Sequence, residues 1–233
     1  MAKDAPVLVT ESSPQSGSEG IYSGSAAFSD KLYPIAKRLL DIALSSTILL
    51  LSAPIILGAA LCIRLESKGS PFFFQVRLGK GGRPFKIFKL RGMYADARDR
   101  FPNLYDYGCH NSLNFYFHFD NDPRITRVGA ITRRLSIDEL PNLWNVLVGD
   151  MSLVGPRPEI PEVLSLYGPY KEKYLSVKPG LTCFSKITGR DHLTKLESVL
   201  LDIDYVDQRN LLTDLKVFLT TLIAVISWGN VRN

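Results

Sequence analysis

The sequence predicts an α+β fold that is mostly helical and includes a segment that enters a membrane. Three observations lead to this prediction. Residues 42–63 carry no charge, and as an α-helix they would extend about 33 Å. A strand, a glycine-rich turn and a second strand occupy residues 72–91. Apolar residues recur with helical spacing over 197–207 and 211–228.

Composition divides the chain into three parts. Residues 1–30 are rich in Ser, Gly, Ala and Pro and hold few large apolar groups, so we expect a disordered tail without a secretion signal. Residues 31–68 form the predicted membrane segment. Residues 69–233 are enough for one sizeable domain. Within it, the polar and aromatic stretch 94–121 predicts only a short helix before Pro102, and residues 161–173 predict a further single helix.

The membrane segment contains a break and has basic residues on both sides. Ser52 and Pro54 lie in the middle of the apolar run, where proline removes a helix hydrogen bond and bends the chain. Basic residues near cytoplasmic ends orient membrane helices. A re-entrant helix-break-helix would place both basic flanks on the cytoplasmic face. A kinked helix that crosses the membrane fully is the alternative. The flanking residues are Lys31, Lys37, Arg38, Arg64, Lys68 and Arg77.

The predicted β-hairpin carries positive charge. Its strands are 72–77 and 83–91, and its turn at 79–82 lacks the Gly-Lys-Ser/Thr ending of a phosphate-binding P-loop. Lys86, Lys89 and Arg91 leave a cationic cluster on the return strand. Solvated surface lysines are the simplest explanation of this cluster, and phosphate binding is the alternative.

Residues 136–159 combine two carboxylates with a constrained arginine. Ser136 and Glu139 have capping-box spacing, which places Asp138 and Glu139 in the first turn of a helix, where free N–H groups favour anions. Downstream, Pro156 and Pro158 restrict the backbone on either side of Arg157. A guanidinium held in this way suits bidentate phosphate binding. An ordinary helix start is the alternative interpretation of the acid pair.

The residues of this stretch resemble a known signature. Asp138 to Pro141, and then Asn145-Val146-Leu147-Val148-Gly149-Asp150-Met151-Ser152-Leu153-Val154-Gly155-Pro156-Arg157-Pro158, resemble the bacterial sugar transferase family of monotopic polyprenyl-phosphate phosphoglycosyl transferases. The resemblance covers about 37–226. It implies a re-entrant membrane helix and a catalytic domain with interfacial helices on the cytoplasmic face of the bacterial inner membrane. The few charges of helix 211–228 suit a helix that lies in the interface, with Trp228 at headgroup depth, and plain core packing is the alternative.

The resemblance also implies a reaction. A sugar-1-phosphate would pass from a UDP-sugar to undecaprenyl phosphate with release of UMP, as the first membrane step in building a surface glycan. Asp138 would be the nucleophile and Glu139 would hold Mg²⁺. The segment Lys89 to Met93 is similar to a family motif, which makes Lys89 and Arg91 phosphate contacts. Arg157, with Pro156 and Pro158, would bind substrate.

Some features leave alternatives open. Cys183, Ser185 and Lys186 depart from the family's usual residues, so the sugar is not predicted. A net charge of +5 fits any anionic partner, but no nucleic-acid-binding module is recognisable. The three cysteines lack metal-site spacing, which favours a reducing compartment. The rival function is a non-catalytic membrane-surface protein that binds anionic lipid. The sequence predicts no oligomeric state.

Overall fold

The computed structural model describes residues 23–105, 113, 115, 122–189 and 193–228, with side chains described between 32 and 225 of these. Most described residues are helical, and the strands form two two-stranded sheets. The predicted α+β, mostly helical fold is therefore confirmed. Residues 1–22 of the predicted tail, most of 106–121 and the side chain of Trp228 lie outside the described set.

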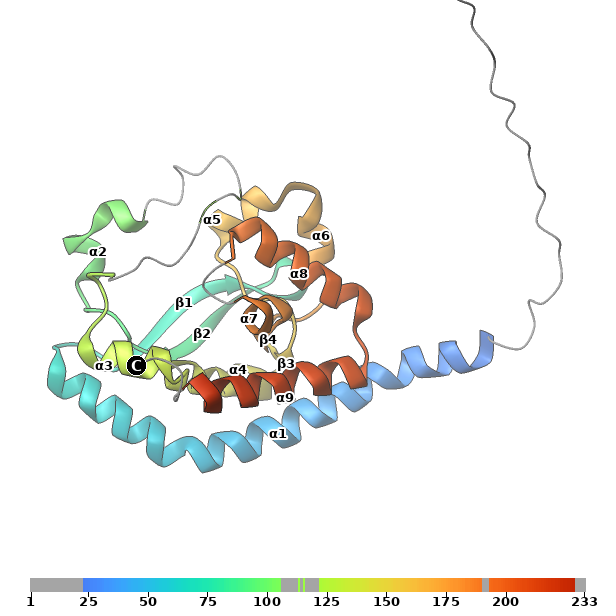
Figure 1. The fold of residues 1–233 in the computed structure, drawn as a ribbon, viewed down its shortest axis with the longest axis horizontal. Coiled ribbons are helices and arrows are strands. Elements are labelled where there is room, and N and C mark those ends of the chain that lie inside the picture. The colour runs from blue at the N-terminus through green and yellow to red at the C-terminus, as the bar shows by residue number, and fades with distance from the viewer. Residues whose placement is uncertain (1–22, 106–112, 114, 116–121, 190–192, 229–233) are drawn as a thin grey trace, which may run out of the picture.

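Helix α1 (Ser23–Glu66) forms the base of the molecule. Its 44 residues are helical throughout, including Pro34 and Pro54. Figure 1 shows that α1 is bent near its middle and that the rest of the domain lies on its concave side. The interruption predicted at Ser52 and Pro54 is thus a bend within one helix. The segment Leu32–Glu66 is long and apolar enough to cross a membrane, and little of its most apolar window is buried in the protein.

One stripe of α1 packs against the domain. The buried positions follow helical spacing and begin with polar residues before becoming apolar: Asp41, Ser45, Ser52, Ile56, Ala60 and Ile63. The opposite face exposes large apolar side chains, which are Leu39, Leu40, Leu50, Leu51, Leu57, Leu61 and Leu65. Such a face is typical of contact with lipid, since soluble proteins rarely expose apolar surface of this extent.

Polar contacts attach the N-terminal half of α1 to the domain. Lys37 forms an ion pair with Asp214 at 2.7 Å. Arg38 donates to the carbonyls of Val146 and Leu147 at 2.6 and 2.7 Å. The buried carboxylate of Asp41 accepts from the Leu153 N–H at 2.9 Å and the Ser152 hydroxyl at 3.1 Å.

The C-terminal end of α1 is held by the same domain. The Glu66 carboxylate accepts from the N–H groups of Arg127 and Val128, at 2.7 and 3.0 Å. These are free donors in the first turn of α3 (Arg127–Arg134), where a carboxylate is favoured. Both ends of the apolar helix are therefore fixed to one polar domain.

The β-hairpin agrees with the prediction. Strands β1 (Phe72–Leu78) and β2 (Pro84–Leu90) pair antiparallel and are joined by η1 (Lys80–Gly82). Two asparagine side chains attach β2 to the next layer. The Phe88 N–H donates to the side-chain oxygens of Asn142 and Asn145, each at 3.1 Å, and the Asn145 amide donates to the Lys86 carbonyl at 2.8 Å.

A helical layer separates this hairpin from α1. It contains α3, η4 (Ile137–Asn142), α4 (Leu143–Val148) and α9 (Leu211–Trp228), as Figure 1 shows. Helix α9 has the bounds that the sequence predicts. Above it lie the parallel strands β3 (Ser152–Val154) and β4 (Gly180–Thr182) and helix α8 (Lys195–Gln208). The remaining elements are α2 (Ala97–Arg100), η2 (Pro102–Tyr105), α5 (Pro161–Leu164), η5 (Ser165–Tyr170), α6 (Lys171–Tyr174) and α7 (Phe184–Thr188).

Two local predictions are wrong. The single helix expected over 161–173 is three short pieces, because Gly168 adopts φ 50 and ψ −122 and Pro169 follows it. The capping box at Ser136 does not form. Ser136 has φ 56 and makes no side-chain cap, and the residues after it form a 3₁₀ helix rather than an α-helix. Asp138 and Glu139 are nevertheless in the first turn of that helix.

Candidate active site

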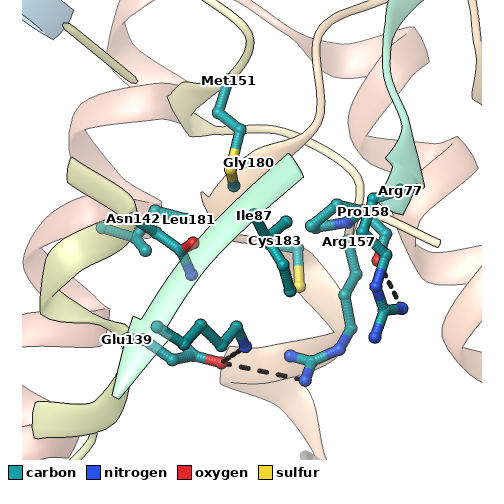
Figure 2. Close-up of a pocket in the computed structure, with 11 residues that line it drawn as sticks. Arg77, Ile87, Glu139, Asn142, Met151, Arg157, Pro158, Gly180, Leu181 and Cys183 are labelled. Carbon is teal, nitrogen blue, oxygen red and sulfur yellow. Dashed lines mark hydrogen bonds and ion pairs between the residues drawn. The ribbon is translucent and has the colours of Figure 1, made fainter. Parts of the chain in front are cut away.

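An open pocket lies where β2, η4, the Pro156–Pro158 loop and β4 meet. Figure 2 shows Glu139 and Arg157 reaching toward each other across it, with Met151 at the top of the view and Leu181 beside Asn142. The lining residues are Arg77, Ile87, Lys89, Glu139, Asn142, Met151, Arg157, Pro158, Gly180, Leu181 and Cys183. The pocket thus brings together four of the residues predicted for the site, Lys89, Glu139, Arg157 and Pro158.

Glu139 is the electrostatic centre of the pocket. Its Oε1 accepts from the Lys89 ammonium at 3.1 Å, and its Oε2 accepts from the Lys186 ammonium at 2.5 Å. The Arg157 Nη2 lies 3.8 Å from Oε1. Burial disfavours the ionised carboxylate, but the charges of Lys186, Lys89 and Arg157 outweigh it and hold the pKa of Glu139 well below its usual range.

Asp138 has the opposite environment. It is half-buried, and burial together with the neighbouring Glu139 charge raises the pKa of Asp138. The positive charges of Lys89, Arg133 and Lys186 oppose this rise. Asp138 is not among the residues that line the pocket, but it lies within electrostatic reach of the same cations. Arg133, on α3, is one of these cations and contributes to the charge balance around Asp138.

The loop that carries Arg157 is fixed by its backbone. The Arg157 N–H donates to the buried Asp202 carboxylate at 2.9 Å, and its carbonyl accepts from the Tyr174 hydroxyl at 2.8 Å. The Pro156 carbonyl accepts from the Gly180 N–H at 2.8 Å. These bonds, with the two prolines, leave the guanidinium as the exposed part of a constrained loop.

The close approach of β3 and β4 requires glycine. A Cβ at Gly155 would lie 2.4 Å from the Lys178 carbonyl oxygen, and one at Gly180 would lie 2.1 Å from the Gly155 nitrogen. Both distances are far inside van der Waals contact. Side chains at these positions would therefore push the Arg157 loop away from the pocket.

The remaining predicted site residues are placed differently. Arg91 is buried and donates to the carbonyls of Lys68 and Ser67, at 2.6 and 2.9 Å. Its guanidinium therefore holds the C-terminal end of α1, and it does not line the pocket. Pro156 is buried beside the pocket-lining Pro158.

Two cations that the sequence did not assign to the site belong to it. Lys186, on α7, contacts Glu139 although 47 positions separate them. Arg77, on β1, lines the pocket and donates to the Pro158 carbonyl at 3.2 Å and to the buried Glu159 carboxylate at 3.3 Å. The sequence marked Lys186 only as a departure from a motif and Arg77 only as a basic flank, because both contacts depend on the folded topology.

The donor set limits how a divalent cation can bind. Among the described residues, no group of three or more His, Cys, Asp or Glu side chains could hold a metal ion. Asp138 and Glu139 supply two adjacent carboxylates. Mg²⁺ commonly binds one or two carboxylates and completes its shell with water and substrate phosphates. The residues therefore fit Mg²⁺ that arrives with a phosphate-bearing substrate.

Comparison with known families agrees with this fold and site. The model of the bacterial sugar transferase family matches residues 32–228. The chain belongs to that family. The resemblance found in the sequence is thereby confirmed, and with it the prediction of an enzyme of the phosphoglycosyl transferase class.

Three relatives illustrate the similarity. Galactosyl transferase CpsE of Streptococcus agalactiae is 38% identical over 195 residues, which are 82% of this chain and 42% of CpsE. Exopolysaccharide production protein ExoY of Rhizobium meliloti is 35% identical over 82% of this chain and 85% of its own. The UDP-glucose:undecaprenyl-phosphate glucose-1-phosphate transferase of Caulobacter vibrioides is 38% identical over 84% of this chain and 72% of its own. The chain thus spans less than half of CpsE but most of the other two.

Proposed function

We propose that this protein transfers a sugar-1-phosphate from a UDP-sugar to undecaprenyl phosphate and releases UMP. The observation that carries the proposal is a pair of adjacent carboxylates, Asp138 and Glu139, of which Glu139 contacts Lys89, Lys186 and Arg157. Two carboxylates amid cations suit a reaction in which an anion attacks a negatively charged diphosphate.

Asp138 acts as the nucleophile in this proposal. Its carboxylate oxygen forms a bond to the sugar-bearing phosphorus of the UDP-sugar, and the bond from that phosphorus to the bridging oxygen breaks. UMP leaves with the electron pair, and an aspartyl phosphosugar remains. A phosphate oxygen of undecaprenyl phosphate then attacks the same phosphorus, which releases the Asp138 carboxylate. Covalent catalysis of this kind divides one difficult transfer into two easier steps.

The surrounding residues lower the cost of bringing anions together. The Arg157 guanidinium, on its constrained loop, grips a phosphate of the diphosphate, and Lys89 offsets charge that develops during transfer. Glu139 is the protein ligand for Mg²⁺, which supplies further charge neutralisation when it is bound with the diphosphate. Lys186 and Arg77 complete the cationic lining.

The position of α1 supports a site at the membrane surface. Both ends of α1 are bonded to the catalytic domain, through Lys37 and Asp41 at one end and Glu66 at the other. The large leucines of α1 that the domain does not cover are exposed, and α1 lies along one side of that domain. We place the domain on the cytoplasmic face, because nucleotide sugars are found there and the lipid phosphate lies at headgroup depth.

The relatives' names support the reaction class and leave the sugar open. The Caulobacter relative is named for UDP-glucose and undecaprenyl phosphate, whereas CpsE is named as a galactosyl transferase. ExoY is named for exopolysaccharide production. We therefore propose a hexose donor and a role in the first step of surface glycan assembly.

The rival function is non-catalytic binding to anionic lipid, which the exposed apolar face of α1 also suits. Steady-state UMP release distinguishes the two. We expect purified protein with Mg²⁺ to release UMP from UDP-glucose or UDP-galactose over many turnovers only when undecaprenyl phosphate is added in excess, and Asp138→Asn to release none. Binding to anionic vesicles without UMP release from any UDP-sugar would support the rival.

A further inference from the structure

The Lys186 ammonium is bound to the Glu139 carboxylate, the group that we propose as the ligand of the divalent cation. Its ammonium lies 2.5 Å from Glu139 Oε2, and its side chain is only 11% exposed. The other carboxylate oxygen, Oε1, accepts from Lys89 at 3.1 Å and faces Arg157 at 3.8 Å. Each oxygen of Glu139 therefore has a protein cation as its partner.

A divalent cation and an ammonium group compete for such an oxygen. Mg²⁺ binds carboxylate oxygens directly at about 2.0–2.1 Å, and this distance leaves no room for an ammonium on the same side of the oxygen. An ion that binds Glu139 on the side where a lysine lies must therefore displace that lysine from its hydrogen bond.

Lys186 is the lysine with an alternative partner in place. Its ammonium also lies 3.4 Å from the carbonyl oxygen of Leu181, on β4. A small movement toward this carbonyl would free Glu139 Oε2 and keep the ammonium hydrogen-bonded, which avoids the cost of a buried unpaired charge. Leu181 also lines the pocket, so the displaced ammonium would stay beside the substrate.

We propose that Lys186 is a resident counter-ion of Glu139 that a divalent cation displaces, and that Lys186 thereby sets the affinity of the site for that cation. The proposal rests on the proposed function only in its assignment of Glu139 as the metal ligand. It assigns to Lys186 a role that its position in the sequence does not indicate.

The test measures metal binding without turnover. Mn²⁺ is titrated into purified protein with a fixed concentration of UDP, free Mn²⁺ is followed by electron paramagnetic resonance, and a titration of UDP alone is the blank. Lys186→Gln removes the charge and keeps a neutral hydrogen-bond donor on a slightly shorter side chain. We expect it to bind Mn²⁺ about tenfold more tightly than wild type, the effect of removing one charge-assisted hydrogen bond. Lys186→Arg keeps the charge and should show no gain.

A matched control separates the site from general charge effects. Lys173 forms an ion pair with Asp207, also at 2.5 Å, on the exposed surface and outside the pocket lining. Lys173→Gln removes the same charge and should leave Mn²⁺ affinity unchanged.

The decisive comparison is made in a Glu139→Gln background. If Lys186 competes at Glu139, Lys186→Gln gives no gain in affinity once the carboxylate is absent. A gain that persists there would mean that Lys186 acts only through its charge at a distance, and would overturn the proposal. Equal affinity in Lys186→Gln and wild type would overturn it too, as would Mn²⁺ binding no stronger than the UDP blank. None of these results would affect the proposed reaction, which UMP release tests separately.

Discussion

Adjacent residues in the site have opposite electrostatic environments. Burial and the Glu139 charge raise the pKa of Asp138, whereas three cations hold the pKa of Glu139 well below its usual range. Glu139 therefore stays ionised across the physiological range. The pKa of Asp138 lies above that of an ordinary aspartate, so its carboxyl becomes ionised at a higher pH. A nucleophilic carboxylate must be ionised to react.

This contrast predicts a pH dependence. As the pH falls through the raised pKa of Asp138, kcat/KM should decline, and the decline should begin at a higher pH than an unperturbed aspartate would give. Lys186→Gln removes a charge that lowers the pKa of Asp138, so the decline should move to higher pH. Lys173→Gln should leave the profile in place. An acid limb that stays fixed or moves to lower pH in Lys186→Gln would contradict the assignment of that limb to Asp138.

The contribution of Arg157 to catalysis should depend on the planar shape of its guanidinium. Arg157→Lys keeps the charge but loses the planar pair of donors, so we expect kcat to fall about 100-fold, the typical cost of losing one oriented donor. Folding and membrane association should be unchanged, because the contacts of the loop are made by its backbone. Arg83→Lys, an exposed change in the hairpin turn, is the control. Wild-type kcat in Arg157→Lys would reduce the guanidinium to a structural role.

At the scale of elements, the sequence predicts structure wherever the signal is local. The hairpin follows from two apolar strands around a glycine turn, and α9 follows from apolar spacing. The pair β3 and β4 was not predicted, because strands of three residues show no alternation and depend on backbone approach at Gly155 and Gly180. The Gly168-Pro169 pair was a turn signal that the helical pattern around it obscured.

Part of the site could be predicted because some of its residues are neighbours in the sequence. The carboxylate pair and the Pro-Arg-Pro loop are visible as contiguous motifs. Lys186 and Asp202 reach the site from elements far along the chain, so only the fold reveals them. Arg91 illustrates the converse, because a residue in a matching motif binds the end of α1 instead of the pocket.

Catalysis should depend on the hydrogen bonds that fix the backbone of the Arg157 loop. Tyr174→Phe removes the hydroxyl that bonds the Arg157 carbonyl, and we expect kcat to fall about tenfold because the loop loses one hydrogen bond. Tyr174 acts through Arg157 in this account, so the double variant with Arg157→Lys should be no slower than Arg157→Lys alone. Tyr170→Phe is the control on the same face of the core. Additive losses in the double variant would mean that Tyr174 acts independently of Arg157.

For the whole molecule, the attachment of α1 restricts its orientation in the bilayer. Residues 37 and 66 are about 43 Å apart along a helix at about 1.5 Å per residue, which exceeds a hydrocarbon core of about 30 Å. Contacts from both ends to one polar domain are therefore incompatible with a helix that crosses the bilayer while that domain stays in water. We infer that both ends of α1 lie on the same face.

Cysteine labelling in intact cells tests this topology. In a variant without native cysteines, single cysteines at Gly20, before α1, and at the exposed Lys80, after it, should both be shielded from a membrane-impermeant thiol reagent. Both should react once the cells are permeabilised, which is the control for accessibility. Labelling of the Gly20 site alone in intact cells would show that α1 crosses the membrane.

The central claim is that Asp138 forms a covalent intermediate, and a single-turnover experiment tests it most directly. Enzyme mixed with UDP-sugar and Mg²⁺, without lipid, should release about one equivalent of UMP and gain the mass of a phosphosugar on the peptide that contains Asp138. Asp138→Asn should show neither signal, while Glu139→Gln should weaken both in a way that excess Mg²⁺ partly restores. Absence of UMP release and of the adduct in an enzyme that turns over with lipid, or an adduct on Glu139, would contradict the account.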